Sequence, residues 1–177
     1  SEAGALGRKT DELLITAMDA GANSSQIHDT SSALEKADVL SLFETFGVAD
    51  IPEDGGRYVA MNPKGFADLF AINEFASADY VGDANLPYAG GMTAKNFLGF
   101  MFFSTSAVTA GKNIAYHTSA VGLGIGADVT TELNYVPEKV SHLATSMMSM
   151  GATVIDDNGV YEVLDNSIDE SLAGHCK

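Results

Sequence analysis

The chain has 177 residues, 46% of them hydrophobic and 19% charged, and its nine basic and 24 acidic residues give a formal net charge of −15. This composition is typical of a globular protein and excludes a disordered chain, while a negative field of this size repels phosphate and disfavours sequence-independent DNA binding. No apolar run is long enough to span a bilayer, and the start lacks the layout of a signal peptide. The single cysteine, Cys176, excludes a disulfide scaffold and fits a reducing compartment.

The first half of the chain predicts three helices. The spacing of apolar residues predicts the first over Leu6–Ala20, with Gly21 placed to end it. Ser32 and Glu35 match a capping box for the second, which Gly47 would end. That helix would direct its apolar side chains toward a core: Leu34, Ala37, Leu40, Phe43 and Phe46.

The third helix follows a short strand predicted over Arg57–Met61. Asn62 is suited to cap it and Pro63 to its first position, where a missing N–H costs nothing. Phe66, Leu69 and Phe70 would form its buried face. The glycine-, alanine- and aspartate-rich stretch 73–95 predicts mostly loop.

The second half predicts strands. Phe97–Thr105 and Ile114–Tyr116 come first, followed by Val121–Ile125 and Asp128–Tyr135, with Pro137 breaking the run. Residues 140–155 predict one long strand or two short ones. Asp156–Gly159 predicts a hairpin turn, because Asn-Gly readily supplies positive φ, and Val160–Leu164 would return as the partner strand. The polar tail 165–177 is expected to fray.

A nucleotide-binding loop is the first candidate for chemistry, at Gly122–Gly126. The dinucleotide fingerprint needs a helix directly after the glycines, so that its N-terminus faces the pyrophosphate. Here Asp128 and a strand-like run follow, and the spacing is G-x-G-x-G. Alternating glycines in a strand more often mark a bend or a close backbone approach, so this interpretation is preferred.

Other candidate groups have simpler structural explanations. The histidines are scattered, and no zinc-type spacing occurs. No serine lies in a nucleophile elbow, and the acidic clusters lack EF-hand spacing. Methionines suit either core packing, which is favoured, or an adaptable subunit contact. We therefore expect no catalytic residue, no cofactor-binding residue and no metal ligand. The groups weighed are His28, His117, His142 and His175; Ser104, Ser106, Ser119 and Ser141; Asp50, Glu53 and Asp54; Asp156 and Asp157; and Met18, Met61, Met92, Met101, Met147, Met148 and Met150.

Three segments, in order, resemble the later part of a tailed-bacteriophage major capsid protein: Gly56–Lys64 (GRYVAMNPK), Ala120–Leu123 (AVGL) and Asp128–Leu164. The resemblance, to podovirus-like and other tailed-phage subunits, runs from about Leu6 to Leu164. It implies an α+β fold of the Hong-Kong-97 type, with an axial domain inserted between the spine helix and the returning strands of a peripheral domain. The implied division is residues 1–31 for the spine helix and connector, 32–127 for the axial domain, 128–164 for the returning strands and 165–177 for a flexible tail.

The resemblance implies a structural, non-enzymatic head protein of a tailed double-stranded DNA phage or prophage. Copies would assemble in the bacterial cytoplasm into pentamers and hexamers of an icosahedral virion shell. The implied partners are scaffolding and portal proteins, with DNA enclosed without sequence-specific binding and no membrane. The family's N-terminal arm and extended loop have no counterpart, and there is no initial methionine, so we expect a truncated form. The alternatives are an encapsulin-like nanocompartment shell, a tail or head-completion component, and a small acidic enzyme using the Gly122–Gly126 loop.

Overall fold

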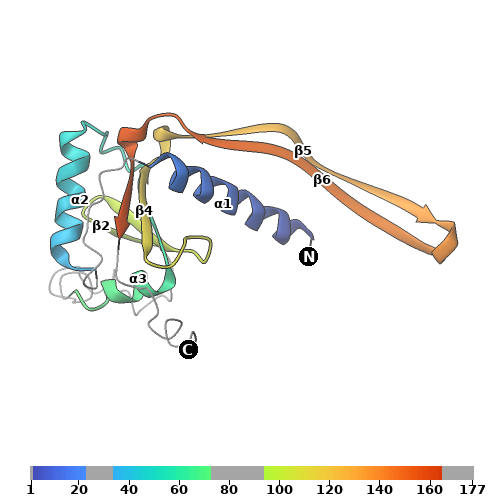
Figure 1. The fold of residues 1–177 in the computed structure, drawn as a ribbon, viewed down its shortest axis with the longest axis horizontal. Coiled ribbons are helices and arrows are strands. Elements are labelled where there is room, and N and C mark those ends of the chain that lie inside the picture. The colour runs from blue at the N-terminus through green and yellow to red at the C-terminus, as the bar shows by residue number, and fades with distance from the viewer. Residues whose placement is uncertain (1, 23–33, 73–93, 165–177) are drawn as a thin grey trace, which may run out of the picture.

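The computed structural model describes residues 2–22, 34–72 and 94–164. In these residues a body of helices and short strands carries a long two-stranded hairpin that projects from it (Figure 1). This mixture is the α+β class that the sequence predicts. The helices are α1 (Glu2–Gly21), α2 (Lys36–Val48) and α3 (Pro63–Leu69), and the strands are β1 (Arg57–Met61), β2 (Lys95–Phe97), β3 (Phe100–Ser104), β4 (Lys112–His117), β5 (Val121–Val136), β6 (Ser141–Val154) and β7 (Val160–Leu164).

The body is built on a five-stranded sheet with the order β2-β3-β1-β4-β7. Strands β1 and β3 are parallel, and every other pair in this sheet is antiparallel. The hairpin β5–β6 forms a separate two-stranded sheet. Short 3-10 turns flank the hairpin strands: η2 (Thr118–Ala120), η3 (Pro137–Lys139) and η4 (Asp157–Gly159).

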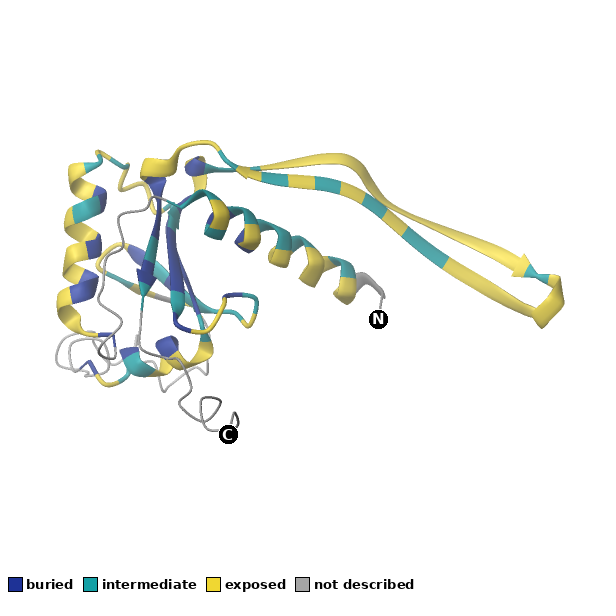
Figure 2. Cartoon of the chain, viewed as in Figure 1, coloured by how far each residue is buried: buried dark blue, intermediate teal, exposed yellow. Residues whose placement is uncertain are grey.

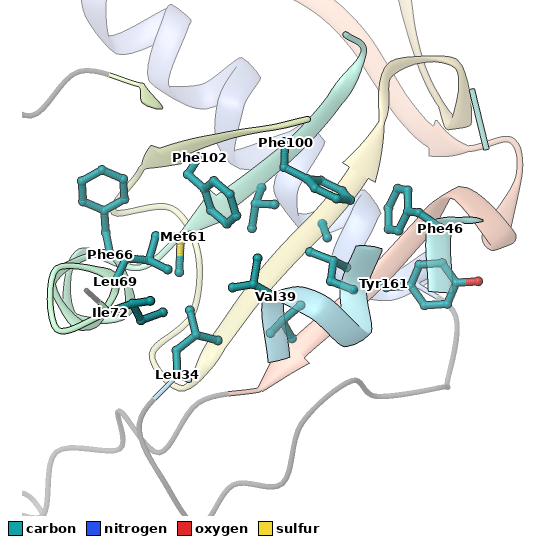
Figure 3. Close-up of a cluster of buried hydrophobic side chains, with 14 residues drawn as sticks. Leu34, Val39, Phe46, Met61, Phe66, Leu69, Ile72, Phe100, Phe102 and Tyr161 are labelled. Atoms are coloured by element: carbon teal, nitrogen blue, oxygen red, sulfur yellow. The ribbon is translucent and has the colours of Figure 1, made fainter. Parts of the chain in front are cut away.

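The central sheet is apolar on both faces, and each face has its own core. Because side chains alternate along a strand, Val59 and Met61 of β1 contribute to one cluster, while Ala60 between them contributes to the other. The first cluster packs beneath α2 and α3 and includes Phe46 and Phe100, whose rings meet edge to face with centroids 5.1 Å apart (Figure 3). The second cluster is covered by α1. The sheet is therefore the middle layer of three.

Helix α2 shows one correction to the sequence analysis. Val39, Leu42 and Phe46 are its buried apolar residues, whereas Leu40 and Phe43, predicted to face the core, are 45% and 40% exposed. The predicted face followed Ala37, Leu40 and Phe43, whereas the stripe in contact with the sheet is the neighbouring one, which includes Val39 and Leu42. Glu35 and Asp38 form the capping box, and the predicted partner Ser32 lies outside the described residues.

Two helices confirm their predictions. Helix α1 ends at Gly21, although it begins at Glu2, earlier than expected. Helix α3 is capped by Asn62, whose side chain accepts a hydrogen bond from the Lys64 amide, with Pro63 at its first position. The loop prediction for 73–95 and the fraying of 165–177 fall largely or wholly outside the described residues.

The predicted strand Phe97–Thr105 is wrong in one respect, because it is divided into β2 and β3. Leu98 and Gly99 both have positive φ, 50° and 79°, and turn the chain back so that the two strands pair. Such values at both central residues fit a tight hairpin turn. Leucine rarely adopts them, and this is why the local sequence did not reveal the turn.

The predicted hairpin at Asp156–Gly159 is also wrong. Strand β6 pairs with β5, and the hairpin turn lies at η3, where Pro137 was expected only to break a strand. Strand β7 pairs with β4 in the body. Asp156 accepts a hydrogen bond from the Asn158 amide and caps the η4 turn, which sends the chain back into the sheet. Because β7 has buried residues on both faces, the central sheet covers it better than a two-stranded hairpin could.

Candidate assembly surface

The hairpin β5–β6 is a candidate binding surface because it is long, apolar in part and uncovered over most of its length. Its strands have 16 and 14 residues, and nearly all of β5 is exposed (Figure 2). A two-stranded hairpin alone in water is only marginally stable. Its large exposed hydrophobic side chains are Leu123, Ile125, Val129, Leu133, Tyr135, Leu143 and Met147.

One face of the hairpin carries an apolar stripe, which is interrupted by the hydrogen-bonded polar pair Thr131 and Ser146. The even-numbered residues of β6 share a face, and among their partners on β5 are Ile125 opposite Met150, Leu133 opposite Ala144 and Tyr135 opposite His142. Two irregularities, between Ile125 and Ala127 and between Ala127 and Thr130, insert extra residues into β5. Bulges of this kind increase the local twist and bend the strand.

Helix α1 supports only the part of this face near the body. The Thr10 hydroxyl lies 3.3 Å from the Met150 sulfur, and Gly21 lies so close to Val154 that an added Cβ would come within 2.7 Å of it. Beyond Met150 the stripe is open, with Leu133 73% and Tyr135 55% exposed. A groove of about 520 Å³ also runs between α1 and β6. The distal hairpin therefore presents apolar surface with nothing among the described residues packed on it.

An ion cluster fixes α1 to the central sheet. The Lys112 ammonium on β4 lies 2.7 Å from Asp19 of α1 and 3.0 Å from Glu162 of β7. Hydrogen bonds to these carboxylates, first to Asp19 and then to Glu162, raise the pKa of Lys112 above its ordinary value of 10.5. The cluster joins three elements near the C-terminal end of α1. This end lies close to the hairpin root, the segment around Ala120 and Ile155 where both hairpin strands join the body.

The hairpin root is held by backbone contacts and by one histidine. The Ala120 carbonyl accepts hydrogen bonds from the Ile155 amide at 2.8 Å and the Asp156 amide at 3.3 Å. An added Cβ on Gly159 would lie 2.5 Å from the Ala120 Cβ. The hydrogen bond from the buried His117 ring is the main cause that lowers the pKa of Asp54 below its ordinary value of 3.8, followed by a hydrogen bond from the Gly56 amide.

The glycines proposed for a nucleotide loop lie inside strand β5. Gly122 pairs with Thr153, and Gly124 pairs with Gly151. No helix follows them, because β5 continues to Val136. The preferred interpretation, a glycine-rich strand, is confirmed, and the geometry does not present a helix N-terminus to a phosphate group.

The remaining sequence candidates are dispersed, with one exception. His117 contacts Ser119, two positions along the chain, and Asp54, which is 63 positions away and which no local pattern connects with it. His142 lies on the hairpin against Tyr135, with ring centroids 5.3 Å apart. His28 and His175 lie outside the described residues. Within residues 2–22, 34–72 and 94–164, no group of three or more His, Cys, Asp and Glu side chains could hold a metal ion.

The methionines of the described residues divide between the core and the surface. Met18 and Met61 are buried in the cores, whereas Met147 is 55% exposed and Met148 and Met150 are half-buried on the hairpin. The apolar side chains of the distal hairpin were assigned to strands correctly, but their exposure was missed. A period-two pattern shows which residues share a face and not whether anything covers it.

Comparisons with known proteins define the class of fold. The structure is similar to that of Mycobacterium phage Che8, with a TM-score of 0.73 and 24% identity over 93% of this chain and 60% of that chain. It is similar to the capsid of cyanophage P-SCSP1u, with a TM-score of 0.71 and 17% identity over 91% and 62% of the two chains. For the mature capsid of bacteriophage PhiM1 the TM-score is 0.68, with 11% identity over 92% and 62%. The chain thus spans about three-fifths of the length of these relatives, and its fold is a phage capsid fold.

The sequence itself matches the model of the family described as phage capsid protein over residues 1–166. The chain therefore belongs to the phage capsid protein family. None of the curated proteins compared with it matches by sequence. In the described part of the chain, no helix has the length and apolar character needed to cross a membrane.

Proposed function

We propose that this chain is a structural shell subunit of the head of a tailed double-stranded DNA phage or prophage. The observation that carries the proposal is the hairpin β5–β6, whose apolar stripe continues past α1 into open solvent. The chain belongs to the phage capsid protein family, and this supports the proposal that a second copy of the chain covers the exposed stripe. The protein would work by geometry and not by catalysis, with many weak contacts adding up to a closed container.

The division of labour within the subunit is part of the proposal. The body, built around the central sheet of β1 to β4 with β7, would form the axial part that gathers around the five- and six-fold axes. Helix α1 and the hairpin would form the peripheral part. The pairing of β7 with β4 supports placing residues 160–164 with the axial part, instead of with the returning strands as the resemblance implied.

The charge of the chain fits a container for DNA. A net charge of −15 repels the phosphates of an enclosed duplex, so the wall would not adhere to its contents. Of the basic residues, Arg57 is buried and Lys112 is paired with two carboxylates. Scaffolding and portal proteins are the further partners we propose, with assembly in the host cytoplasm.

A cellular nanocompartment shell is the second candidate. The structure is similar to that of a virus-like particle from Pyrococcus furiosus, with a TM-score of 0.58 and 14% identity over 88% of this chain. At that identity the likeness concerns the fold alone. The family match favours the phage head.

Sedimentation velocity, combined with electron microscopy of whatever assembles, tests the proposal. We expect concentration-dependent self-association that strengthens with salt, because screening relieves the repulsion between acidic copies. Leu133→Asn should weaken it by about tenfold or more, since burying a leucine contributes about 1.5 to 3 kcal/mol. Val48→Asn, which alters an equally exposed side chain at the end of α2, is the matched control and should have no effect. A chain that stays monomeric up to about 100 μM at every salt concentration would refute self-assembly through this surface.

A further inference from the structure

His117 occupies the position where the hairpin joins the body. It is the last residue of β4 and directly precedes η2, from which β5 begins. Its side chain is only 3% exposed. One ring nitrogen, Nδ1, lies 3.2 Å from the backbone nitrogen of Ser119 and 2.7 Å from the Ser119 hydroxyl. The other, Nε2, lies 3.0 Å from a carboxylate oxygen of Asp54 in the loop between α2 and β1.

These contacts assign the protonation state of the ring. A backbone amide can only donate a hydrogen bond, so Nδ1 must present a lone pair to the Ser119 N–H. The ring proton is then on Nε2, where it is donated to Asp54. The arrangement is therefore that of a neutral imidazole, and its hydrogen bond to Ser119 caps the η2 turn.

We propose that His117 is a proton-operated latch where the hairpin joins the body, which caps the η2 turn when the ring is neutral and removes that cap when the ring is protonated. A proton added to Nδ1 turns this atom into a donor that faces the donor N–H of Ser119. The Ser119 hydroxyl can rotate to accept from Nδ1, but the Ser119 amide loses its acceptor. At the same time, the positive ring is attracted more strongly to the Asp54 carboxylate. Protonation thus removes the cap from the η2 turn, leaves only the Ser119 hydroxyl in contact with Nδ1, and strengthens the contact with Asp54 of the α2–β1 loop.

The charged group in contact with the His117 ring is Asp54. The register partner of His117 on β1 is Arg57, whose guanidinium donates instead to the carbonyls of Ile51 and Pro52 and pairs with Glu53. The charged groups on the loop, β1 and η4 beside it are Asp50, Glu53 and Asp54 of the loop, Arg57 of β1, and Asp156 and Asp157 of η4.

The hairpin would amplify a small change at this point. Both of its strands attach at Ala120, which follows Ser119 and binds the amides of Ile155 and Asp156. Helix α1 supports β6 as far as Met150. Beyond it, residues 141–150 extend about 30 Å at about 3.3 Å per residue, so a change of about 10° in the direction of this free part displaces the tip by about 5 Å. A loosened cap at η2 therefore alters the position of the apolar stripe.

Nuclear magnetic resonance of the full chain provides the first test. Long-range ¹⁵N–¹H spectra at about pH 7.5 should show the His117 ring protonated on Nε2 and not on Nδ1. The opposite tautomer would overturn the proposal, because Nδ1 could not then accept from Ser119. This measurement needs no variant and so does not depend on any substitution being tolerated.

Hydrogen exchange, corrected for the intrinsic effect of pH, provides the second test. Between about pH 7.5 and pH 5, protection of amides 118–121 should fall at least about fivefold in the parent chain. His117→Asn keeps a capping oxygen but cannot titrate in this range, so its protection should change less than about twofold. His142→Asn, on the distal hairpin, should respond like the parent. Equal pH responses in the parent and His117→Asn would overturn the latch, whether or not the chain assembles into shells.

Discussion

Arg57 offers the sharpest test of what holds the α2–β1 loop to the body. Its side chain is 2% exposed, and the guanidinium lies over the rings of Phe46 and Phe100, 5.7 and 5.6 Å from their centroids. It donates hydrogen bonds to the carbonyl oxygens of Ile51 and Pro52. Arg57→Ala removes the packing and the ring contacts and orphans both carbonyls, so we expect a loss of about 3 to 5 kcal/mol in the free energy of unfolding.

Two further substitutions separate the causes. Arg57→Met preserves most of the apolar volume but not the hydrogen bonds, and should cost about 2 kcal/mol, because the partly exposed loop carbonyls can regain water. Glu53→Gln breaks the ion pair, whose acidic partner is 66% exposed, and should cost less than about 0.5 kcal/mol. Urea denaturation followed by circular dichroism measures each value, with the exposed Lys64→Ala as the control for removing a cation. If Glu53→Gln is as costly as Arg57→Met, the ion pair and not the carbonyl bonding holds the loop, and the reasoning fails.

Two predictions concern the attachment of α1 and of the hairpin. Lys112→Met should lower the free energy of unfolding by about 1 kcal/mol, a value reduced by partial exposure, and by less at high salt. Because the folded-state pKa of Lys112 is raised, its contribution is fully present below pH 10.5 and is lost as the pH rises through the folded pKa. A parent-to-variant difference that stays constant from neutral pH to beyond that range would contradict the pairing with Asp19 and Glu162. Gly159→Ala should cost about 1 to 3 kcal/mol through overpacking at the hairpin root, as measured by thermal unfolding. Its control is Gly151→Ala, where an added Cβ meets nothing within 4 Å, and equal effects of the two substitutions would refute the close packing.

Where local signals were strong, the sequence predicted the structure well. Gly21 ends α1, Asn62 and Pro63 start α3, and the glycines of β5 lie in a strand. Each of these depends on chemistry within a few residues, such as a cap or a run of β-favouring side chains. The error in strand pairing arose where two segments compete for the same partner. Asp156–Gly159 carries a genuine turn signal, but strand pairing is decided by what remains to be buried.

The candidate site divides in the same way. The residues of the distal hairpin could be assigned to strands from their pattern, and the resemblance predicted a capsid subunit. Their exposure could not be predicted, because it depends on how far along the hairpin α1 packs against β6 in the folded chain. The contact of His117 with Asp54 joins residues 63 positions apart, and no local pattern connects them.

By itself, the sequence determined the acidic charge, the α+β class, the end of α1, the start of α3 and the absence of a recognisable catalytic motif, since these follow from composition and from interactions between near neighbours. The predicted end of α2 at Gly47 was wrong, because this helix continues to Val48. Only the tertiary structure decided that β7 completes the central sheet, that β5 and β6 stand apart as a hairpin, and that a buried histidine joins the two. The physical reason is that burial and pairing are properties of the whole chain. A segment's surroundings depend on every other segment that competes for the same apolar surface.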